Sequence, residues 1–322
     1  MAKKIVLKEK FGDKLLENVM LSEQTTFKIG GPAKFFVTAE SNDELIKFIK
    51  TAKDLELDYF ILGGGSNLLV SDQGYNGLII KVGSKKMEIK ADNVIVDAGY
   101  NFCRLVNETA RSGLGGLEKL VGIYGTVGGA IFGNSGAFGK SVGSAVSEVE
   151  CLINGKIERL KAADCRFSYR DSVFKKNGAI ILSAVLKLKP GAKEEMQKIV
   201  YDTTMIRCKN LPAEPSAGCI FKNVLLAGID KEKVLKGLDL SRGEFEELTK
   251  FGKLPVGYVI DALGFKGKNI GGAQVSEKHC NFIINTGKAT SSDVIMLVSI
   301  IKEKVRNKLG LQLEEEIQKL GF

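Results

Sequence analysis

Two glycine-rich loops are the first candidates for binding chemistry. Gly63-Gly64-Gly65 follows the apolar run 59–62, and Gly125-Thr126-Val127-Gly128-Gly129 forms a second loop. Successive small residues let several backbone N–H groups converge on a pyrophosphate, above all where a helix begins. Glycines also serve turns and close backbone packing, so both interpretations stay open at this point.

The familiar nucleotide-binding patterns are missing. Gly113-Leu114-Gly115 has Glu118 where the dinucleotide fingerprint needs a glycine, and Gly139-Lys140-Ser141 has Asn134 where a Walker loop needs one. A Rossmann domain and a P-loop NTPase are therefore disfavoured.

The cysteines and the single histidine narrow the remaining chemistry. The cysteines stand at 103, 151, 165, 208, 219 and 280 and include no CxxC pair, which disfavours a zinc site or a redox dithiol. His279 is the only histidine, so multi-histidine metal sites are excluded. We expect free thiols and no metal.

Composition and charge indicate a globular protein. The 322 residues include 47 Lys+Arg and 38 Asp+Glu, a net charge of +9, and 44% are hydrophobic. No cluster of basic residues interleaved with aromatic ones appears, so we expect no nucleic-acid partner. The longest apolar runs, such as 294–301, are too short to span a bilayer, and residues 1–12 lack an apolar signal core. We expect a cytoplasmic chain with no membrane partner.

Periodicity predicts mixed helices and strands, hence an α+β fold. Helices are predicted over 41–52, 102–111 and 193–208, over the charged stretch 230–250, and from a Thr290/Ser291 cap onward; strands are predicted at 59–62, 68–70, 78–80, 94–96, 149–153 and 179–188. The segment 211–215, with two prolines, marks a boundary. We expect a region 1–208, with subdomains of about 1–82 and 83–208, and a C-terminal domain 209–322.

A set of motifs in one order resembles the UDP-N-acetylenolpyruvoylglucosamine reductase (MurB) family. The motifs lie at Thr26–Ala33, Gly63–Val70, Gly125–Ala130, Phe167–Ser172, Pro215–Asn223, Gly257–Gly267, Gly271–Asn285 and Leu313–Ile317. They span nearly the whole chain, and their spacing is similar to the shorter, type II branch of the family.

The resemblance implies an FAD-binding fold of the p-cresol methylhydroxylase/vanillyl-alcohol oxidase type, with a C-terminal α+β substrate-binding domain. NADPH would reduce FAD, and hydride would pass to the enolpyruvyl group of UDP-N-acetylglucosamine enolpyruvate, giving UDP-N-acetylmuramate for peptidoglycan synthesis. The FAD region contains no histidine, so we expect noncovalent FAD. The partners implied are the nucleotide-sugar substrate and NADPH, and we expect a monomer.

Three residues match the family's catalytic positions: Arg170, Cys219 and Glu316. Hydride addition to an enol ether pushes negative charge onto the carboxylate, which an arginine fork and a protonated glutamate can stabilise. Cys219 stands where most members carry serine and would donate a proton to C2, unless it is only a small buried hydrophobe. The resemblance further assigns FAD contacts to Gly63, Gly64, Gly65, Ser66, Asn67, Gly125, Thr126, Val127, Gly128, Gly129 and Ala130, and substrate contacts to Lys222, Asn223 and Gln274.

Departures from the family pattern leave some points open. Tyr124 and Val224 replace usual prolines, Asn210 replaces a lysine that some members use, and the segment 224–255 looks long. His279 is either structural or near the substrate. Two alternatives remain: another FAD oxidoreductase of this fold acting on an alcohol or a lactone, and a noncatalytic basic binding protein that kept the fold.

Overall fold

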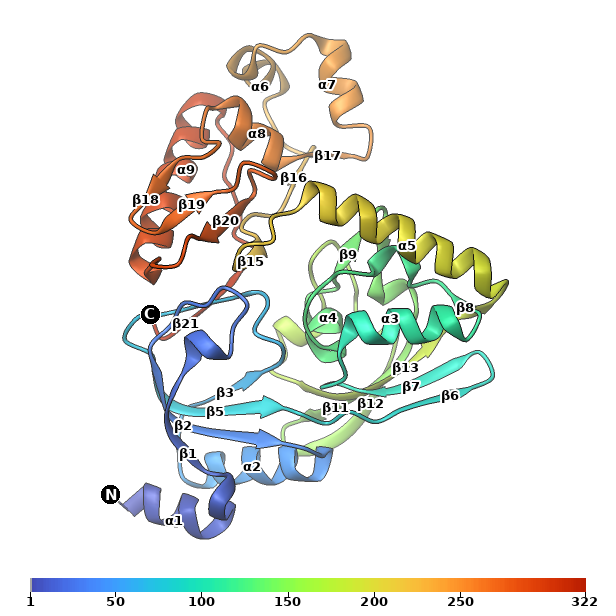
Figure 1. The fold of residues 1–322 in the computed structure, drawn as a ribbon, viewed down its shortest axis with the longest axis vertical. Coiled ribbons are helices and arrows are strands. Elements are labelled where there is room, and N and C mark those ends of the chain that lie inside the picture. The colour runs from blue at the N-terminus through green and yellow to red at the C-terminus, as the bar shows by residue number, and fades with distance from the viewer. Residues whose placement is uncertain (1) are drawn as a thin grey trace. The chain divides into compact units, whose positions relative to one another are not determined.

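The computed structural model describes residues 2–322, which form two compact units (Figure 1). The first unit contains the chain up to Val19, Ala33–Gly65 and Asn76–Lys209, and the second contains Met20–Pro32, Ser66–Tyr75 and Asn210–Phe322. Each unit has its own core of buried apolar side chains. The predicted region 1–208 includes 20–32 and 66–75, whereas both segments fold into the second unit.

Long-range hydrogen bonds hold these two segments in the second unit. Strand β4 (Leu68–Val70) pairs in parallel with β21 (Gln318–Leu320) near the C-terminus. The Asp72 carboxylate accepts the Ser291 N–H at 2.9 Å, and Asn285 Nδ2 donates to the Phe27 carbonyl at 3.2 Å. Local hydrophobic periodicity does not reveal partners that lie far away in the chain. The sequence alone therefore could not assign these two segments to the second unit.

The first unit begins with a four-stranded sheet and two helices. Its strand order is β1 (Leu16–Met20), β2 (Pro32–Ala39), β5 (Tyr75–Val82) and β3 (Tyr59–Leu62), with β3 parallel to β5. Helix α1 (Ala2–Phe11) contacts α2 (Asn42–Asp54), which buries Leu45, Phe48 and Ile49.

The start of α2 carries only half of a capping box. Ser41 Oγ accepts the Glu44 N–H at 3.2 Å. The Glu44 carboxylate, however, accepts the N–H of Glu40 at 3.0 Å and not that of Ser41. Glu40 precedes the cap residue, so the return hydrogen bond reaches one residue further back along the chain than in a standard capping box.

A five-stranded antiparallel sheet forms the rest of the first unit. Its order is β12 (Lys156–Lys161), β11 (Val146–Ile153), β13 (Ile180–Lys187), β7 (Asn93–Asp97) and β6 (Met87–Lys90). Helices α3 (Phe102–Arg111) and α4 (Val127–Phe132) lie over one face of this sheet, with α5 (Lys193–Asn210) beside them (Figure 1). Short strands complete the unit: β8 (Leu114–Gly115), β9 (Gly136–Ala137), β10 (Lys140–Ser141) and β14 (Lys189–Pro190).

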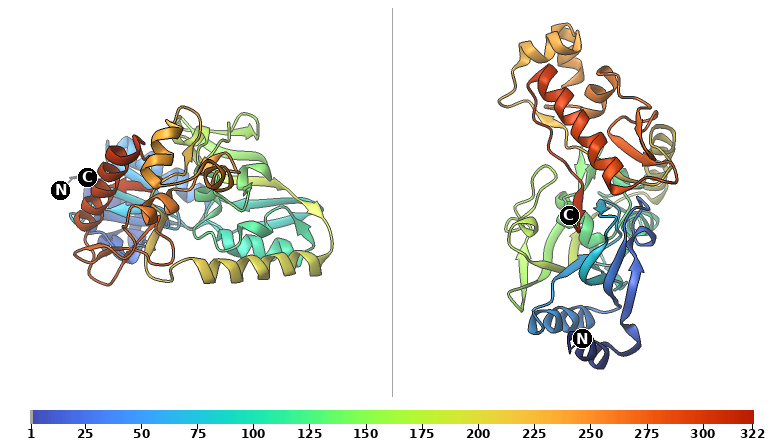
Figure 2. Two further views of the ribbon diagram at one scale, coloured as in Figure 1. Left: turned by 90° about the horizontal axis from the view of Figure 1, so that it is seen from above. Right: turned by 90° about the vertical axis from the view of Figure 1, so that its left-hand side faces the viewer.

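The second unit is built on a four-stranded antiparallel sheet. Its order is β15 (Ser216–Cys219), β20 (Phe282–Asn285), β19 (Ala273–Val275) and β18 (Asn269–Ile270). Helix α9 (Ser291–Leu309) lies along this sheet, and α8 (Val256–Ala262) contacts α9 (Figure 2). As predicted, Thr290 caps α9, here in a full capping box with Asp293, and Gly310 ends the helix at φ 70°.

The long segment 224–255 folds as a helical pair closed by a small hairpin. Strand β16 (Val224–Leu225) pairs with β17 (Lys253–Leu254), and between them lie α6 (Lys231–Leu238) and α7 (Arg242–Leu248). A Cβ on Gly237 would lie 2.4 Å from Leu309 Cδ2, so the glycine lets α6 approach the end of α9. The prediction of helical structure in 230–250 is confirmed.

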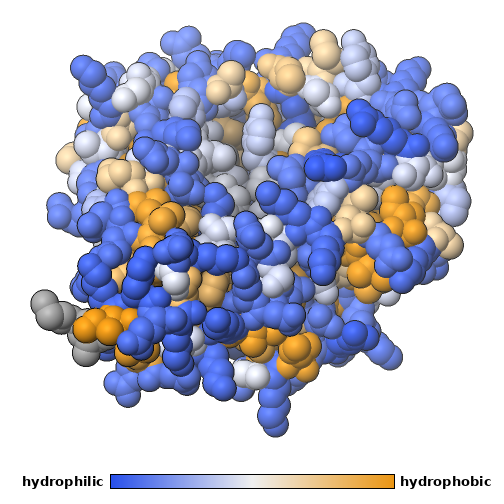
Figure 3. Space-filling model, turned by 60° about the horizontal axis from the view of Figure 1, so that its bottom comes forward, coloured by the Kyte–Doolittle hydropathy of each residue, from blue (hydrophilic) through white to orange (hydrophobic). Residues whose placement is uncertain are grey.

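The exterior carries only scattered apolar groups on the face seen in Figure 3. Hydrophilic side chains cover most of that face, and the apolar areas between them are small and separate. Within residues 2–322, no helix combines the length and the apolar character needed to cross a bilayer.

Candidate functional site

The two glycine loops of the first unit touch each other backbone to backbone. A Cβ on Gly64 would lie 2.6 Å from Gly125 Cα, and one on Gly63 would lie 2.8 Å from Thr126 Oγ1. Gly65 at φ 61° and Gly125 at φ 122° adopt conformations that residues with a side chain rarely adopt. We call Gly63–Gly65 together with Gly125 and Thr126 the glycine cradle.

The rest of the second loop forms the start of α4 and has internal partners. The N–H of Val127 donates to the Tyr100 carbonyl at 2.9 Å, and that of Gly128 donates to the Ala98 carbonyl at 2.8 Å. The Gly129 N–H donates to the capping hydroxyl of Thr126 at 3.3 Å. These three N–H groups are therefore engaged inside the protein. We therefore take the glycine cradle as the candidate site for a pyrophosphate.

Arg170 lies in the first unit at the tip of a tight turn. Ser168 and Asp171 exchange backbone hydrogen bonds across it, and Arg170 has φ 56°. Its Nη2 donates to the Gly136 carbonyl at 2.7 Å, and its guanidinium carbon lies 5.3 Å from the centroid of the Tyr169 ring. The half-buried guanidinium is thus held by a carbonyl and an aromatic face, which fixes its orientation.

Cys219 and Glu316 are brought together in the second unit by a short ladder. The Glu316 N–H donates to the Ile220 carbonyl at 2.7 Å, and the Lys222 N–H donates to the Glu314 carbonyl at 2.9 Å. Phe221 therefore faces Glu315 in an antiparallel bridge. We call residues 219–222 and 314–316 the catalytic ladder, because it carries two of the three predicted catalytic residues.

Glu315 anchors one strand of the catalytic ladder through two lysines. Its carboxylate lies 2.9 Å from Lys302 Nζ and 2.7 Å from Lys319 Nζ. Burial alone would raise the pKa of Glu315, but the hydrogen bonds from Lys319 and Lys302 outweigh it and hold the pKa below its usual range. Glu315 is therefore a fixed carboxylate at neutral pH.

Asn67 contacts the same strand of the ladder. Its side-chain Nδ2 donates to the backbone carbonyl of Glu316 at 3.0 Å, and its backbone carbonyl accepts the Gln318 N–H at 3.0 Å. Ser66 and Asn67 belong to the second unit, whereas Gly63–Gly65 belong to the first. The predicted FAD residues are thus divided between the units, and the contact between Asn67 and Glu316 was not foreseen from the sequence.

The three predicted substrate residues all have partners within the second unit. Lys222 Nζ pairs with the Glu314 carboxylate. Asn223 Oδ1 accepts the N–H of Val256, the first residue of α8, at 3.1 Å. Gln274 Nε2 donates to the Gly267 carbonyl at 3.0 Å. Their substrate contacts stay a prediction, since each side chain also has a structural bond.

His279 is half-buried and neutral. Burial lowers its pKa, its ring meets Phe282 edge to face at 5.0 Å, and its Nδ1 accepts the Asn281 N–H at 3.3 Å. A Cβ on Gly257 would lie 3.1 Å from its Cε1, so α8 covers the ring closely. These contacts favour the structural interpretation of His279.

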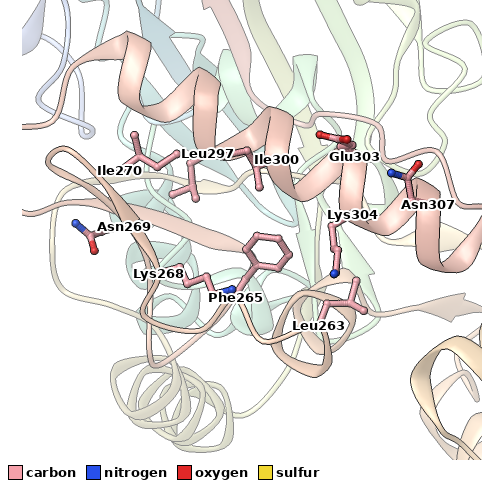
Figure 4. A pocket seen from close by; sticks show the side chains of 10 residues that line it. All are labelled: Leu263, Phe265, Lys268, Asn269, Ile270, Leu297, Ile300, Glu303, Lys304 and Asn307. Atoms are coloured by element: carbon pink, nitrogen blue, oxygen red, sulfur yellow. The ribbon is translucent and has the colours of Figure 1, made fainter.

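Two surface hollows are lined by none of the predicted site residues. The one in Figure 4 has a volume of about 480 Å³ and lies between α9 and the β18 region of the second unit, with an apolar floor. Another, of about 520 Å³, is in the first unit, where Glu108 accepts from the Tyr100 hydroxyl. Burial, together with Glu108, raises the Tyr100 pKa to about 12. Neither hollow, as lined by the described residues, contains a predicted catalytic group.

Comparison with known proteins gives two family matches. Residues 210–320 match the family described as UDP-N-acetylenolpyruvoylglucosamine reductase, C-terminal domain. Residues 33–160 match the family described as FAD binding domain.

Relatives similar over nearly their whole length are found among known proteins. The UDP-N-acetylenolpyruvoylglucosamine reductase of Carboxydothermus hydrogenoformans is 37% identical, over 98% of this chain and 97% of the relative. That of Bacillus subtilis is 34% identical, over 98% and 97%. The crystal structure of the corresponding reductase (MurB) from Thermus caldophilus superposes with a TM-score of 0.75 at 33% identity, over 95% of this chain and 98% of that one.

Proposed function

The chain belongs to the UDP-N-acetylenolpyruvoylglucosamine reductase family, and on that basis we propose how its residues carry out the reaction. Its fold is an FAD-binding fold of the p-cresol methylhydroxylase/vanillyl-alcohol oxidase type with a C-terminal α+β domain, and its cofactor is FAD. Its function is the reduction of UDP-N-acetylglucosamine enolpyruvate to UDP-N-acetylmuramate in peptidoglycan synthesis. The match over 210–320 argues against an alcohol or lactone as substrate.

The glycine cradle is the proposed binding site for the FAD pyrophosphate. Its backbones lie so close that a side chain at Gly63 or Gly64 would collide with the facing loop. When bound, FAD supplies the hydride that reaches C3 of the enolpyruvyl group, with NADPH as the proposed electron donor. Residues 1–208 contain no histidine, so a histidyl–flavin bond cannot form there and the cofactor is held by noncovalent contacts.

Arg170 is proposed to bind the substrate carboxylate. A guanidinium offers a planar pair of donors that suits a carboxylate, and it keeps its charge at any working pH. Because its Nη2 is already bound to the Gly136 carbonyl, the group is oriented before substrate arrives. A fixed cation stabilises the negative charge that builds up on the carboxylate during hydride addition.

The catalytic ladder is the observation on which the proposed proton chemistry rests. Hydride addition at C3 leaves an electron pair at C2, delocalised into the carboxylate, and C2 must then gain a proton. The Cys219 thiol gives that proton and becomes a thiolate, which regains a proton from solvent before the next turnover. The backbone of Glu316 is bonded to the Ile220 carbonyl, next to Cys219 in the chain. Its carboxyl group is proposed to donate a hydrogen bond that stabilises the enolate.

The two half-reactions test the roles of Arg170 and Glu316. In stopped-flow, Arg170→Ala and Glu316→Ala should still lose their flavin colour with NADPH. They should regain it about 10²–10³-fold more slowly with the enolpyruvyl substrate, because they stabilise charge that appears only after hydride transfer. Damage confined to the NADPH step would contradict both roles, and a purified protein without flavin would contradict the proposed function itself.

A pair of substitutions isolates the proton donor. Cys219→Ser replaces the thiol by the hydroxyl that is commoner in the family and should keep substantial turnover. Cys219→Ala should lose most turnover while hydride still reaches C3. Unchanged turnover in Cys219→Ala would remove this residue from the mechanism.

A further inference from the structure

The carboxamide of Asn281 is buried directly behind the catalytic ladder. The residue is 2% exposed, so each polar atom of its side chain needs a partner inside the protein. Asn281 Nδ2 donates to the Phe221 carbonyl at 2.8 Å, and Asn281 Oδ1 accepts the Phe221 N–H at 3.0 Å. One side chain therefore satisfies both backbone groups of one residue.

Antiparallel geometry explains why Phe221 needs this partner. The Ile220 carbonyl accepts the Glu316 N–H, and the Lys222 N–H donates to the Glu314 carbonyl. The backbone groups that face 314–316 therefore belong to the residues on either side of Phe221. The N–H and C=O of Phe221 must then point to the opposite side, where a further strand would normally pair. Asn281 takes the place of that strand. Phe221 is 1% exposed, so water cannot replace the amide.

The backbone of Asn281 is fixed as well. Its carbonyl accepts the Ile220 N–H at 2.8 Å, and its N–H donates to His279 Nδ1 at 3.3 Å. The neutral, half-buried imidazole of His279 thus keeps its Nδ1 as the acceptor for the Asn281 N–H. A continuous set of hydrogen bonds runs from His279 through Asn281 and Ile220 to Glu316.

We propose that Asn281, supported by His279, is a positioning residue that sets the register of the Cys219–Lys222 segment against 314–316, and so places the Cys219 thiol relative to Glu316. The proposal rests on the catalytic roles proposed above for these two residues. Without the carboxamide, the N–H and C=O of Phe221 lose their partners, and the segment must shift to satisfy them. Cys219, two residues earlier, shifts with it.

Two Asn281 substitutions and a matched control test this role in the FAD-loaded protein. Asn281→Leu keeps the volume and removes both bonds, whereas Asn281→Asp keeps the acceptor for the Phe221 N–H and sets a carboxylate against the Phe221 carbonyl. The control is Asn285, also buried at 6% exposure, whose amide bonds to the Phe27 and Lys28 carbonyls instead. Asn285→Leu and Asn285→Asp should lower the melting temperature to a similar extent.

We expect NADPH to reduce the flavin of the Asn281 variants at the wild-type rate. The enolpyruvyl substrate should reoxidise it about 10²-fold more slowly, because a displacement near 1 Å at the reacting atoms costs a factor of about that size. The Asn285 variants should reoxidise at the wild-type rate. Equal losses in both half-reactions, or equal losses in the Asn281 and Asn285 variants, would show a merely structural role and overturn the proposal. If Asn281→Leu fails to fold, Asn281→Asp carries the comparison.

A second readout does not depend on turnover. Iodoacetamide labelling of native protein, read at Cys219 by peptide mass mapping, should be about 5–30-fold faster in the Asn281 variants, which corresponds to a modest loss of local stability. It should be unchanged in the Asn285 variants. Wild-type labelling of Cys219 in both Asn281 variants would overturn the positioning role. Failure of the wild type to reoxidise with the enolpyruvyl substrate would instead overturn the proposed function.

Discussion

Replacing Gly64 by alanine should weaken both the first unit and its hold on FAD. The new Cβ would lie 2.6 Å from Gly125 Cα, 3.2 Å from its carbonyl carbon and 3.4 Å from Thr126 N. Carbon atoms in contact normally lie about 3.5–4.0 Å apart, so the loops must separate by about 1 Å. Both sides of the clash are backbone, so no rotamer change can relieve it.

The magnitude follows from that overlap. Overpacking of this kind costs about 1–3 kcal/mol, which at about 2–4 °C per kcal/mol lowers the melting temperature by about 2–12 °C. Each 1.4 kcal/mol by which the opened cradle disfavours binding raises the FAD dissociation constant about tenfold. Circular dichroism melts of the apoprotein give the first quantity, and quenching of flavin fluorescence on titration gives the second.

Gly133→Ala is the matched control for this experiment. A Cβ there would meet its nearest neighbour, the Gly129 carbonyl oxygen, at 3.6 Å, and the residue has φ −87°. Alanine should therefore fit at the end of α4 without loss of stability or of FAD affinity. If Gly64→Ala had the same melting temperature and the same FAD dissociation constant as Gly133→Ala, the contact between the loops would not be the reason why position 64 is a glycine.

Three further outcomes are expected. Heat or acid denaturation should release all the flavin into solution, and colour left on the precipitate would contradict noncovalent binding. Asp72→Ala removes the carboxylate that accepts the Ser291 N–H at 2.9 Å at the start of α9. Urea unfolding should show that the free energy of unfolding falls by about 0.5–2 kcal/mol. An unchanged midpoint would show that Thr290 caps the helix unaided. Because the folded pKa of Glu315 is lowered, its stabilising effect is complete above its ordinary pKa and is lost as the pH falls through the folded value. The difference in unfolding free energy between wild type and Glu315→Gln should therefore shrink from neutral to acid pH, and a constant difference would contradict the ion pairs with Lys302 and Lys319.

Local features of the fold could be predicted because their causes are local. The cap at Thr290 and the helix that follows it are neighbours in the chain, and both are confirmed. The assignment of 66–75 to the second unit depends on β4 pairing with β21, some 250 residues later in the chain. Three consecutive apolar residues predict a strand but say nothing about its partner.

The roles within the glycine loops show the same limit. The sequence treats Gly128 and Gly129 alike, yet a Cβ on Gly128 would lie 2.8 Å from Ala98 Cβ, whereas one on Gly129 has 3.6 Å to its nearest neighbour. Gly128 therefore serves close packing, which was one of the two interpretations left open. Which glycine has which role depends on a neighbour about 30 residues earlier in the chain, which no spacing rule identifies.

The catalytic residues came from family motifs, and the residues that position them came from the structure. Cys219 and Glu316 could be named because they stand in motifs with a known order. Asn281 lies in one of those motifs, but its role depends on hydrogen bonds to Phe221, 60 residues away. The sequence does not distinguish an asparagine that stabilises a turn from one whose side chain bonds to a strand in place of a neighbouring strand.

The arrangement around Cys219 also explains why the serine substitution is an informative test of acidity. Strand β15 has only four residues, its register slips between Ser216 and Cys219, and Gly218 has φ 81°. Such a short, irregular edge strand would place its last side chain poorly by itself. The position of Cys219 is set instead by the next two residues, which are held by Asn281 on one side and by 314–316 on the other. Because these contacts hold the backbone on both sides of the segment, a serine at position 219 should occupy nearly the same place, and the difference in reoxidation rate between Cys219 and Cys219→Ser should reflect the chemistry of the donor and not its position.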